Sequence, residues 1–425
     1  MNLRQKNGRP NGLSFLPFAY CLLPKKMYLC RTNSNSNIMK ILFVINNFYI
    51  KGNGLSGSAR RTVKELREAG QDVRILSAAN PDPNGPQPDY VLKKFDMPLF
   101  QPLLTPQGIS MARKDPKLIE EAVRWADLVH LEEAFTLQFK TLNIAKRLGK
   151  PVTATYHYHP ENVFSTMKMG RWHLPNRCML LVYRFAVYNR CRMIQCPTEN
   201  VKERLLRYRV NVPLRVISNG VLPDACIRPE TPPADYFDEN RPLKVICIGR
   251  LSDEKDQPTL FKAMRHSRFA KRIQLQFAGQ GPTEKALKRR GKKLVDKGVL
   301  TYTPEFGFYS HDELRQLMAN ADLCVHCATT EVEGLSVMEA LQQGAVPVIA
   351  TGKYSATAQF ALDDRSVFPG RNSKVLAQRI DYWLSHPEER WETGKKYVES
   401  MKPYDISKSV QALIEMFEQC STQHS

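Results

Sequence analysis

The sequence predicts an α/β protein built from two doubly wound domains that face a cleft. The 425-residue chain is longer than the roughly 250–300 residues at which a single core usually divides. Signals for strands and helices alternate along it, which is typical of parallel sheets joined by right-handed crossovers. The alternation stops at a linker rich in proline and acidic residues, at 223–242, and then restarts. Two such runs around one linker predict two Rossmann-like domains.

The first domain is expected to cover residues 39–222. It begins with an apolar run, Lys40–Asn46, which fits a strand buried on both faces. The helix predicted next, Ser58–Ala69, has Val63 and Leu66 at helical spacing and ends before a glycine. The further predicted segments are a helix near 117–125 and strands at 73–78, 127–132, 151–157, 193–198 and 214–219.

The second domain is expected to cover residues 243–404. Its predicted strands lie at 243–250, 273–279, 299–305, 321–326, 345–350 and 366–370. A last helix, Ser407–Gln419, carries apolar residues on one face. It belongs to a C-terminal segment, 405–425, that we expect to pack back on the first domain.

The first 38 residues precede the predicted fold, which we expect to open at Met39. Their apolar run, Leu13–Leu23, is shorter than the ~20 residues that span a bilayer. Basic residues precede the run as in a signal peptide, but no small-residue cleavage site follows it. We interpret residues 1–38 as a poorly structured or misassigned extension; a peripheral membrane anchor is the alternative.

The formal net charge of +20 lies almost wholly in the first half of the chain. Residues 1–225 carry 34 Lys and Arg against 16 Asp and Glu, whereas residues 226–425 carry 28 against 26. The imbalance predicts an anionic partner, such as a phospholipid surface, a lipid phosphate or a nucleic acid; a solvated basic surface is the alternative. Because no nucleic-acid recognition motif supports the third choice, we expect no nucleic-acid partner.

The stretch Met167–Arg215 mixes cations with aromatic residues. A basic amphipathic helix in it could lie on anionic lipid. The mixed face of this helix is expected to contain Leu180, Leu181, Tyr183, Arg184 and Tyr188. An ordinary core helix with a solvated cationic rim is the alternative.

The ten cysteines are scattered, with a lone CxxC at Cys324 and Cys327. This pair lies in a predicted buried strand, where residues three apart face opposite ways. Structural zinc needs more ligands than two. We therefore expect no metal site and no disulfide, and free thiols in a reducing compartment.

Three carboxylates surround one glycine in TTEVEGLSVMEALQQGAVPVIAT, residues 329–351. Ser336 and Glu339 have the spacing of a capping box, which predicts a helix beginning at Ser336. The free N–H groups of such a helix end form an anion site, and Gly334 lets the backbone approach a ligand closely. The alternative is that Glu339 only caps its helix while Glu331 and Glu333 are solvated.

Arg250 and Lys255 follow the strand predicted at 243–250, where a parallel sheet presents its ligands. Arginine offers phosphate a planar fork, and lysine offers a point charge. If the sheet order brings these loops together, a diphosphate could lie between two cations and a helix end. The nearby carboxylates would then suit sugar hydroxyls, with Glu339 on a ribose and Glu331 on a hexose.

These motifs together resemble the retaining family-4 glycosyltransferases, whose fold is called GT-B. The acidic signature of that family is two glutamates separated by seven residues, as in Glu331 and Glu339. The other matching segments are GRLSDEKDQPTLFKA, FAGQGPTEKAL and VISNGVL. The resemblance covers about residues 39–400, and the order and spacing of the motifs make it specific.

The resemblance implies a role for each matching residue. Glu331 would hold hydroxyls of the donor sugar, and Glu339 would hold the ribose of the nucleotide. The side chains and backbone N–H groups that would hold the diphosphate are those of Arg250, Lys255, Leu335 and Ser336.

The turn departs from the family pattern at Val332 and Glu333, where a glycine and an aromatic residue are common. A stiffer and more acidic turn leaves the identity of the donor open. We expect Glu333 to be exposed to solvent; a second sugar contact is the alternative.

Two segments of the first half complete the expected site. GNGLSG, residues 52–57, has GxGxxG spacing but does not directly follow its strand, which argues against dinucleotide binding. The resemblance implies a loop there that abuts the donor phosphate and the acceptor through Gly54 and Gly57; a flexible turn is the alternative. In TYHYHPENV, the resemblance favours His157 over His159 as a residue beside the donor sugar, and a structural histidine is the alternative.

The expected activity is transfer of a hexose from a nucleoside-diphosphate sugar to a hydroxyl of a lipid or glycan acceptor, with retention of configuration. The sequence contains no DxD motif, so we expect no metal and no cofactor besides the donor substrate. The expected place is the cytoplasm, peripheral to the inner face of the membrane. The alternatives are a noncatalytic protein that binds sugar nucleotides or polyanions, and an NAD-dependent enzyme.

Overall fold

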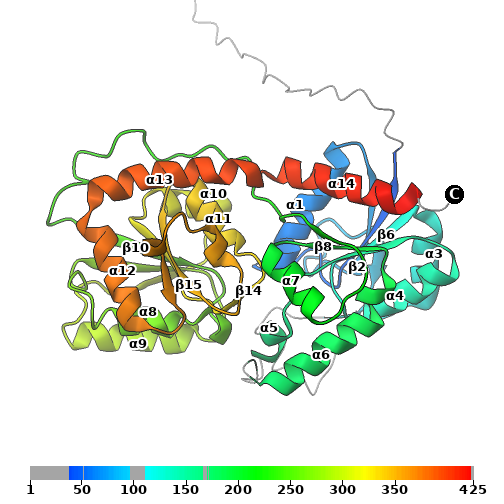
Figure 1. Ribbon diagram of the computed structural model, residues 1–425, viewed down its shortest axis with the longest axis horizontal. Helices are drawn as coiled ribbons and strands as arrows, with labels where there is room; N and C mark the ends of the chain where they lie inside the picture. Colours follow the sequence, from blue (N-terminus) through cyan, green and yellow to red (C-terminus); the bar gives the residue numbers. More distant parts are fainter. Residues whose placement is uncertain (1–37, 51, 96–110, 166–169, 171, 423–425) are drawn as a thin grey trace, which may run out of the picture. The chain divides into compact units, whose positions relative to one another are not determined.

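The structure is a computed structural model that describes residues 38–50, 52–95, 111–165, 170 and 172–422. The extension predicted at 1–38 therefore lies outside the described residues, apart from Ile38. The described chain contains two large parallel sheets flanked by helices (Figure 1), which confirms the predicted fold class.

The first sheet has seven parallel strands in the order β3-β2-β1-β6-β7-β8-β9. These strands are β1 (Lys40–Val44), β2 (Asp72–Ala78), β3 (Tyr90–Leu92), β6 (Leu128–Leu131), β7 (Val152–Thr155), β8 (Met193–Cys196) and β9 (Leu214–Val216). In the register of β1 and β2, Ile41 lies beside Val73. Both side chains are buried, as expected for a sheet covered on both faces.

The helices of the first half and a short antiparallel strand pair complete this unit. The helices are α1 (Gly54–Glu68), α3 (Pro116–Trp125), α4 (Thr136–Arg147), α5 (Pro160–Ser165), α6 (His173–Ala186), η2 (Tyr188–Arg190) and α7 (Glu199–Arg207). The antiparallel pair is β4 (Lys94–Phe95) with β5 (Met111–Ala112).

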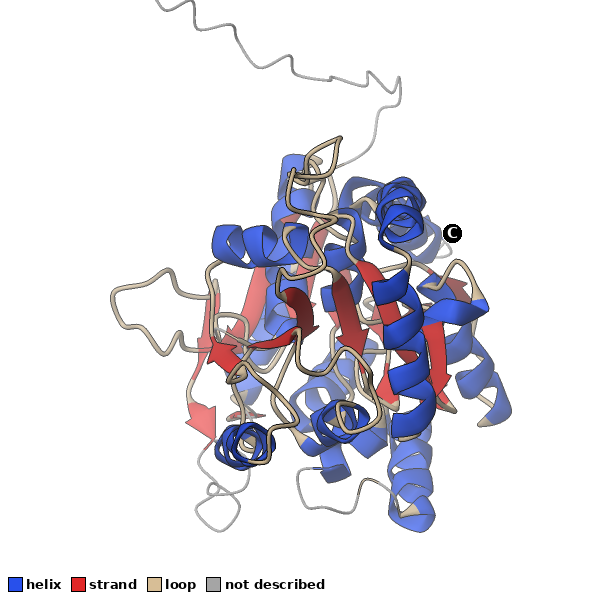
Figure 2. Cartoon of the chain, turned by 90° about the vertical axis from the view of Figure 1, so that its left-hand side faces the viewer, coloured by secondary structure: helices blue, strands red, loops and turns tan. Residues whose placement is uncertain are grey.

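The second sheet has six parallel strands in the order β12-β11-β10-β13-β15-β17, and Figure 2 shows helices on either side of it. The strands are β10 (Leu243–Ile248), β11 (Ile273–Ala278), β12 (Glu305–Gly307), β13 (Leu323–His326), β15 (Val346–Thr351) and β17 (Val367–Pro369). A separate parallel pair is formed by β14 (Thr330–Glu331) and β16 (Tyr354–Ser355). The helices are η3 (Asp253–Lys255), α8 (Gln257–Ala263), α9 (Glu284–Asp296), α10 (His311–Ala319), α11 (Leu335–Gln342), η4 (Thr357–Phe360), η5 (Asp364–Ser366), α12 (Ser373–Ser385), α13 (Pro387–Met401), η6 (Lys402–Tyr404) and α14 (Ile406–Thr422).

The strand predicted at 299–305 is wrong for most of its length, because β12 begins only at Glu305. The Val299 N–H donates to the carbonyl of Leu294 and thereby closes the end of α9. Pro304 has no N–H for a strand ladder, and its ring packs close to Gly291 of α9 instead. The apolar residues of this segment therefore cover a helix rather than extend the sheet edge.

The C-terminal helix α14 packs against the first half of the chain. Its buried residues Val410, Leu413 and Phe417 lie in the same apolar cluster as Ile41 and Phe43 of β1. Helical spacing places these α14 residues on one face. The helix follows α13 and lies beside α1 (Figure 1), so the end of the chain returns to the first sheet.

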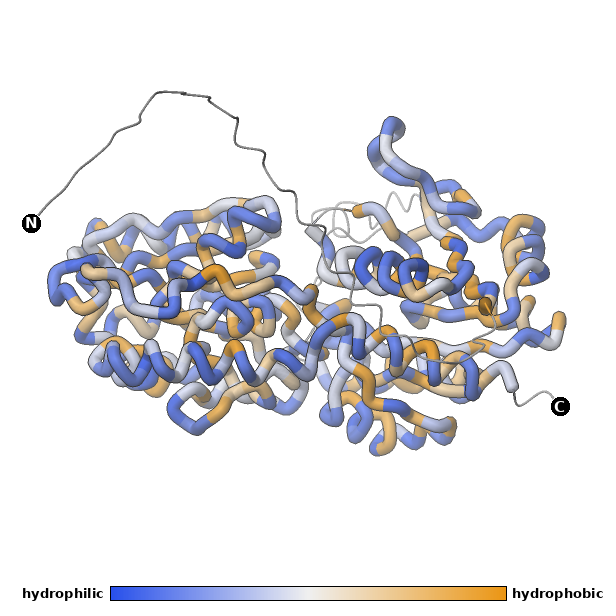
Figure 3. Tube along the Cα trace, turned by 90° about the horizontal axis from the view of Figure 1, so that it is seen from above, coloured by the Kyte–Doolittle hydropathy of each residue, from blue (hydrophilic) through white to orange (hydrophobic). Residues whose placement is uncertain are grey.

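Hydrophilic and hydrophobic residues alternate along the helices, as Figure 3 shows. This pattern fits helices that are packed on one side and solvated on the other. Within the described ranges, no helix combines the length and the apolar character needed to cross a bilayer.

Candidate active site

Lys255 and Glu331 meet at the carboxyl ends of neighbouring strands. Lys255 lies in η3 after β10, and Glu331 lies in β14 after β13, which pairs with β10 in the sheet. Their side chains form a direct, partly exposed ion pair. Burial alone would raise the pKa of Glu331, but Lys255 and then His326 outweigh it, so the pKa lies below its ordinary value. The carboxylate is therefore ionised and ready to accept hydrogen bonds at neutral pH.

Arg250 lies on the same strand edge, directly after Gly249 at the end of β10. Gly249 has a φ of 125°, a conformation that favours glycine, and this turns the chain toward the loop. Burial lowers the pKa of Arg250 from its ordinary value, while Glu254 and Tyr158 act in the opposite direction. Because arginine stays charged in proteins, Arg250 remains a cation in the loop that also carries Lys255.

The first turn of α11 presents backbone N–H groups beside this edge. Gly334 caps the helix with a φ of 100°, and a Cβ at this position would lie 2.5 Å from Thr357 Oγ1. Only glycine fits such a turn without strain. The helix begins at Leu335, and no described side chain caps it. The predicted capping box at Ser336 is therefore wrong, and the N–H groups of Leu335 and Ser336 stay at an uncapped helix end.

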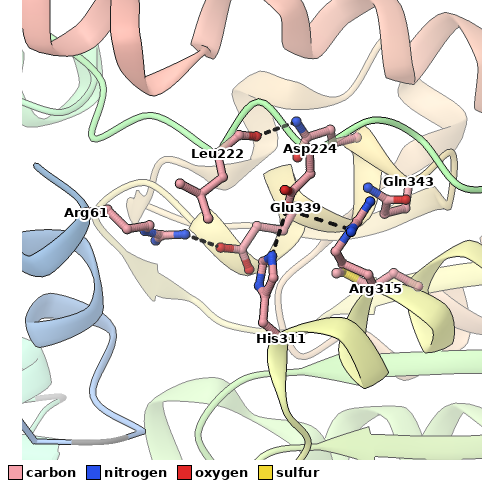
Figure 4. A pocket seen from close by; sticks show the side chains of 9 residues that line it. Arg61, Leu222, Asp224, His311, Arg315, Glu339 and Gln343 are labelled. Carbon is pink, nitrogen blue, oxygen red and sulfur yellow. Dashed lines mark hydrogen bonds and ion pairs between the residues drawn. The ribbon is translucent and has the colours of Figure 1, made fainter. Parts of the chain in front are cut away.

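Glu339 is paired with a residue of the first half instead of with its own helix. Arg61 of α1 donates from Nη1 to Glu339 Oε1 at 2.7 Å, and both side chains are about one-fifth exposed. Figure 4 shows this contact among the side chains that line a small pocket. The described residues that line the pocket are Arg61, Leu222, Asp224, His311, Arg315, Met318, Glu339, Gln342 and Gln343. Glu339 therefore faces a pocket that is lined mostly by polar and charged residues.

His157 follows β7 and contacts a buried carboxylate. His157 Nε2 lies 2.9 Å from Glu132 Oε2, and His130 Nε2 lies 3.0 Å from Glu132 Oε1. Burial would raise the pKa of Glu132, yet His157 and His130 lower it to about 2. Glu132 thus holds the ring of His157 in one orientation.

His159 lies in a different environment. It is fully buried, with Nδ1 3.0 Å from both the Tyr156 hydroxyl and Arg204 Nη1. Burial and then Arg204 keep the pKa of His159 well below its ordinary value. A neutral, enclosed histidine of this kind serves the packing of the fold. His157 is the less buried of the two histidines.

Tyr158 connects the histidine segment to both neighbouring loops. Its side chain is hydrogen-bonded to Asn53, which caps α1. Burial raises the pKa of Tyr158, and Arg250 lies close enough to act against that increase. The histidine segment, the first turn of α1 and the Arg250 loop therefore converge.

Gly54 and Gly57 lie in the first turn of α1, so the predicted loop or flexible turn at 52–57 is wrong beyond residue 53. The side chain of Asn53 accepts from the N–H groups of Leu55 and Ser56 and starts the helix there. Among the described atoms, none lies within 4 Å of a Cβ placed on either glycine. The two glycines therefore border open space.

Glu333 is not exposed to solvent, which corrects the prediction for this residue. Its side chain accepts from the Ser218 hydroxyl, from the Asn219 N–H at 3.2 Å and from Asn219 Nδ2 at 2.6 Å. Burial nevertheless raises the pKa of Glu333 above its ordinary value. The neighbouring Val332 carbonyl accepts from the Thr198 hydroxyl at 3.1 Å. Glu333 therefore links residues 331–334, which we call the glutamate turn, to the segment that follows β9.

Removal of the Glu333 carboxylate is expected to destabilise the protein. Glu333→Ala leaves the donors of Ser218 and Asn219 without a partner, at a cost of about 1–3 kcal/mol in the free energy of unfolding. Urea unfolding measures the change, with the exposed Glu121→Ala as control. A stable variant whose only defect is a higher donor KM would instead assign Glu333 to the sugar.

Sequence reasoning missed two charged residues of this region, Arg61 and Glu132. Neither belongs to a motif, and Arg61 lies 278 positions from Glu339 in the chain. A signal for Glu132 was present, because an acid directly follows an apolar strand at the edge where ligands bind.

Comparisons with known proteins identify the family of this chain. The family model described as Glycosyltransferase Family 4 matches residues 52–225, and the model described as Glycosyl transferases group 1 matches residues 232–400. The chain therefore belongs to the GT-B glycosyltransferases that these models describe. The resemblance inferred from the motifs is confirmed.

Individual relatives are more distant. The alpha-monoglucosyldiacylglycerol synthase of Streptococcus pneumoniae is 26% identical over 74% of this chain and 71% of its own length. The sulfoquinovosyl transferase SQD2 of Arabidopsis thaliana is 25% identical over 73% of this chain and 58% of its own length. The crystal structure of Anabaena HepE in complex with UDP and glucose is 16% identical, covers 90% of this chain and 100% of that one, and has a TM-score of 0.67.

Proposed function

We propose that this glycosyltransferase moves a hexose from a nucleoside-diphosphate sugar to a hydroxyl of a lipid acceptor, with retention of the anomeric configuration. The observation that supports the proposal is the Lys255–Glu331 ion pair, which joins the loop after β10, where Arg250 also lies, to the turn that leads into the uncapped end of α11. Two cations and free N–H groups at one place suit a diphosphate.

The acceptor part of the proposal is supported by the relatives. One is named as a synthase of a glucosyl diacylglycerol, and the other as a sulfoquinovosyl transferase. We therefore prefer a lipid over a soluble glycan as the proposed acceptor. A position at the inner face of the membrane is part of the same proposal.

The chemistry assigns a distinct task to each group. The barrier lies in separating a cationic sugar from an anionic leaving group, and preorganised positive charge stabilises that separation. Arg250, Lys255 and the N–H groups of Leu335 and Ser336 would supply this charge, so the proposal needs no metal and no cofactor. The leaving phosphate would accept the proton of the acceptor hydroxyl.

The carboxylates would bind hydroxyls. Glu331, ionised beside Lys255, would accept from hydroxyls of the donor sugar. Glu339 would accept from the ribose once it exchanges Arg61 for the nucleotide. His157, held by Glu132, would lie beside the sugar, and Gly54 and Gly57 would leave room for the diphosphate and the acceptor.

The test is a matrix of donors and acceptors. Nucleotide sugars that differ in base and in hexose are incubated with diacylglycerol, a glycosyl diacylglycerol, a sterol or a soluble oligosaccharide, and released nucleoside diphosphate is measured. The anomeric coupling constant of the product then reports retention or inversion. If no donor releases nucleoside diphosphate with any of the acceptors, the result would favour a noncatalytic binding protein. An inverted product would contradict the mechanism.

Loss of the Glu339 carboxylate is expected to weaken donor binding. One hydrogen bond to a charged group contributes about 1.5–3 kcal/mol, so Glu339→Ala should raise the donor Kd about 10- to 100-fold. Calorimetry with the nucleoside diphosphate measures this, with Glu121→Ala as matched control. Unchanged affinity would remove Glu339 from the nucleotide site.

A further inference from the structure

The outward face of α6 carries large apolar side chains in contact with water. Leu174, Val182 and Phe185 are 72%, 60% and 61% exposed, and Trp172, just before the helix, is 59% exposed. Cys178 is also exposed. Positions 174, 178, 182 and 185 follow the spacing of one helix face. They therefore form a single stripe, which we call the α6 stripe.

The opposite face of α6 packs against the core of the first half of the chain. Leu180 and Tyr183 are buried, and the ring of Tyr183 meets Phe135 edge to face at 5.9 Å. The mixed face predicted from the sequence is therefore wrong, because Leu180, Tyr183 and Tyr188 point into the core. The α6 stripe is a second apolar face, and among the described residues it has no covering element.

The surroundings of the α6 stripe are cationic. Residues 162–198 contain no Asp or Glu. Arg177 is exposed on α6, and the Arg184 guanidinium lies 4.5 Å from the centre of the Phe185 ring. At the end of the helix, Arg190 lies over the half-exposed ring of Phe139. An apolar stripe with arginines along its side is complementary to a partner surface that has an apolar interior and negatively charged groups at its border.

We propose that the α6 stripe docks on a bilayer of anionic phospholipid. The helix would lie in the plane of the interface, with the α6 stripe in the boundary between headgroups and acyl chains and with the arginines on lipid phosphates. The inference deepens the proposed function, on which it rests for a reason to visit a membrane. A protein partner is disfavoured because the cations would need an acidic counterpart of matching shape.

The position of α6 gives this contact a use. In Figure 1, α6 lies beside α5 at the edge of the first half. Helix α5 also contacts η3, which carries Lys255. A bilayer on the α6 stripe would therefore lie one helix away from the candidate site, where a lipid hydroxyl could reach the donor.

Vesicle flotation of the full-length protein tests the proposal. Phosphatidylcholine vesicles with and without phosphatidylglycerol are compared at low and high salt. Wild-type protein is expected to float with the anionic vesicles and to lose part of this binding at high salt. Leu174→Ser/Phe185→Ser should weaken binding at least tenfold, because two large side chains lose their transfer into the interface. Arg177→Gln should weaken it about fivefold and reduce its salt dependence.

The matched control is Leu206→Ser/Leu362→Ser, which removes two exposed leucines, 54% and 47% exposed, from other elements. This control should bind vesicles like the wild type. All variants replace exposed side chains, so unchanged thermal unfolding is expected and verifies the fold. Activity on an acceptor dispersed in detergent should also stay unchanged.

The possible outcomes separate the two proposals. The docking surface would be overturned if the Leu174→Ser/Phe185→Ser variant floated like the wild type. It would also be overturned if the wild type did not bind anionic vesicles. The wild type could instead fail to bind vesicles but sediment as a dimer that the Leu174→Ser/Phe185→Ser variant does not form. That result would assign the α6 stripe to contact with a second copy of the chain. Lipid binding that needs the α6 stripe, together with no transfer from any donor, would leave the docking surface standing and refute the proposed function.

Discussion

Arg250→Ala is expected to lower kcat for glycosyl transfer on the order of 10²-fold or more. Loss of one preorganised group that stabilises developing charge typically has this effect. Arg250 follows Gly249 at the end of β10, the strand edge where Lys255 and Glu331 meet, and its charge would be aimed at the leaving diphosphate. A factor of 10² corresponds to about 2.7 kcal/mol of transition-state stabilisation.

Steady-state kinetics with the donor and acceptor found in the matrix would measure the effect. Arg250→Lys, which keeps the charge but loses the planar fork, should give an intermediate rate. Arg290→Ala is the matched control, because Arg290 is exposed on α9 and is not among the candidate site residues. Near-normal turnover of Arg250→Ala would refute the assigned role.

Glu132→Ala is expected to destabilise the protein by about 1–3 kcal/mol, the usual cost of leaving a buried hydrogen-bonding group without its partner. The side chain is buried, and its carboxylate faces His130 and His157 at 3.0 and 2.9 Å. Because His157 would lose the group that orients it, kcat should fall in addition. Denaturant unfolding and kinetics on the same preparation measure the two effects separately.

The pH dependence gives a second, independent check on Glu132. Its pKa is about 2 in the folded protein against an ordinary value of 4.5, so the unfolded state binds the proton more readily. The stabilisation is therefore fully present above about pH 4.5 and is lost as the pH falls toward 2. The stability gap between the wild type and Glu132→Gln should be widest near neutral pH and should shrink in acid. A gap that stays constant with pH would show that Glu132 is not ionised in the fold.

Much of the fold could be predicted because its signals are local. The apolar run at 40–46 became β1, and the run at 243–250 became β10, since a strand buried on both faces must be apolar throughout. The prediction at 299–305 failed because an apolar run can equally cover a helix. In the glutamate turn, the sequence pattern of a capping box was outweighed by Gly334, whose backbone starts the helix one residue earlier.

The sequence by itself determined the two-sheet architecture, the family and the candidates Arg250, Lys255, Glu331 and Glu339. Their spacing and their places after strands are properties of neighbouring residues. Only the tertiary structure decided what each side chain contacts. Glu333 was expected in solvent because its donors, Ser218 and Asn219, lie 115 and 114 positions away. The partner of a charge depends on which loops the strand order brings together, and no local pattern in the chain records that order.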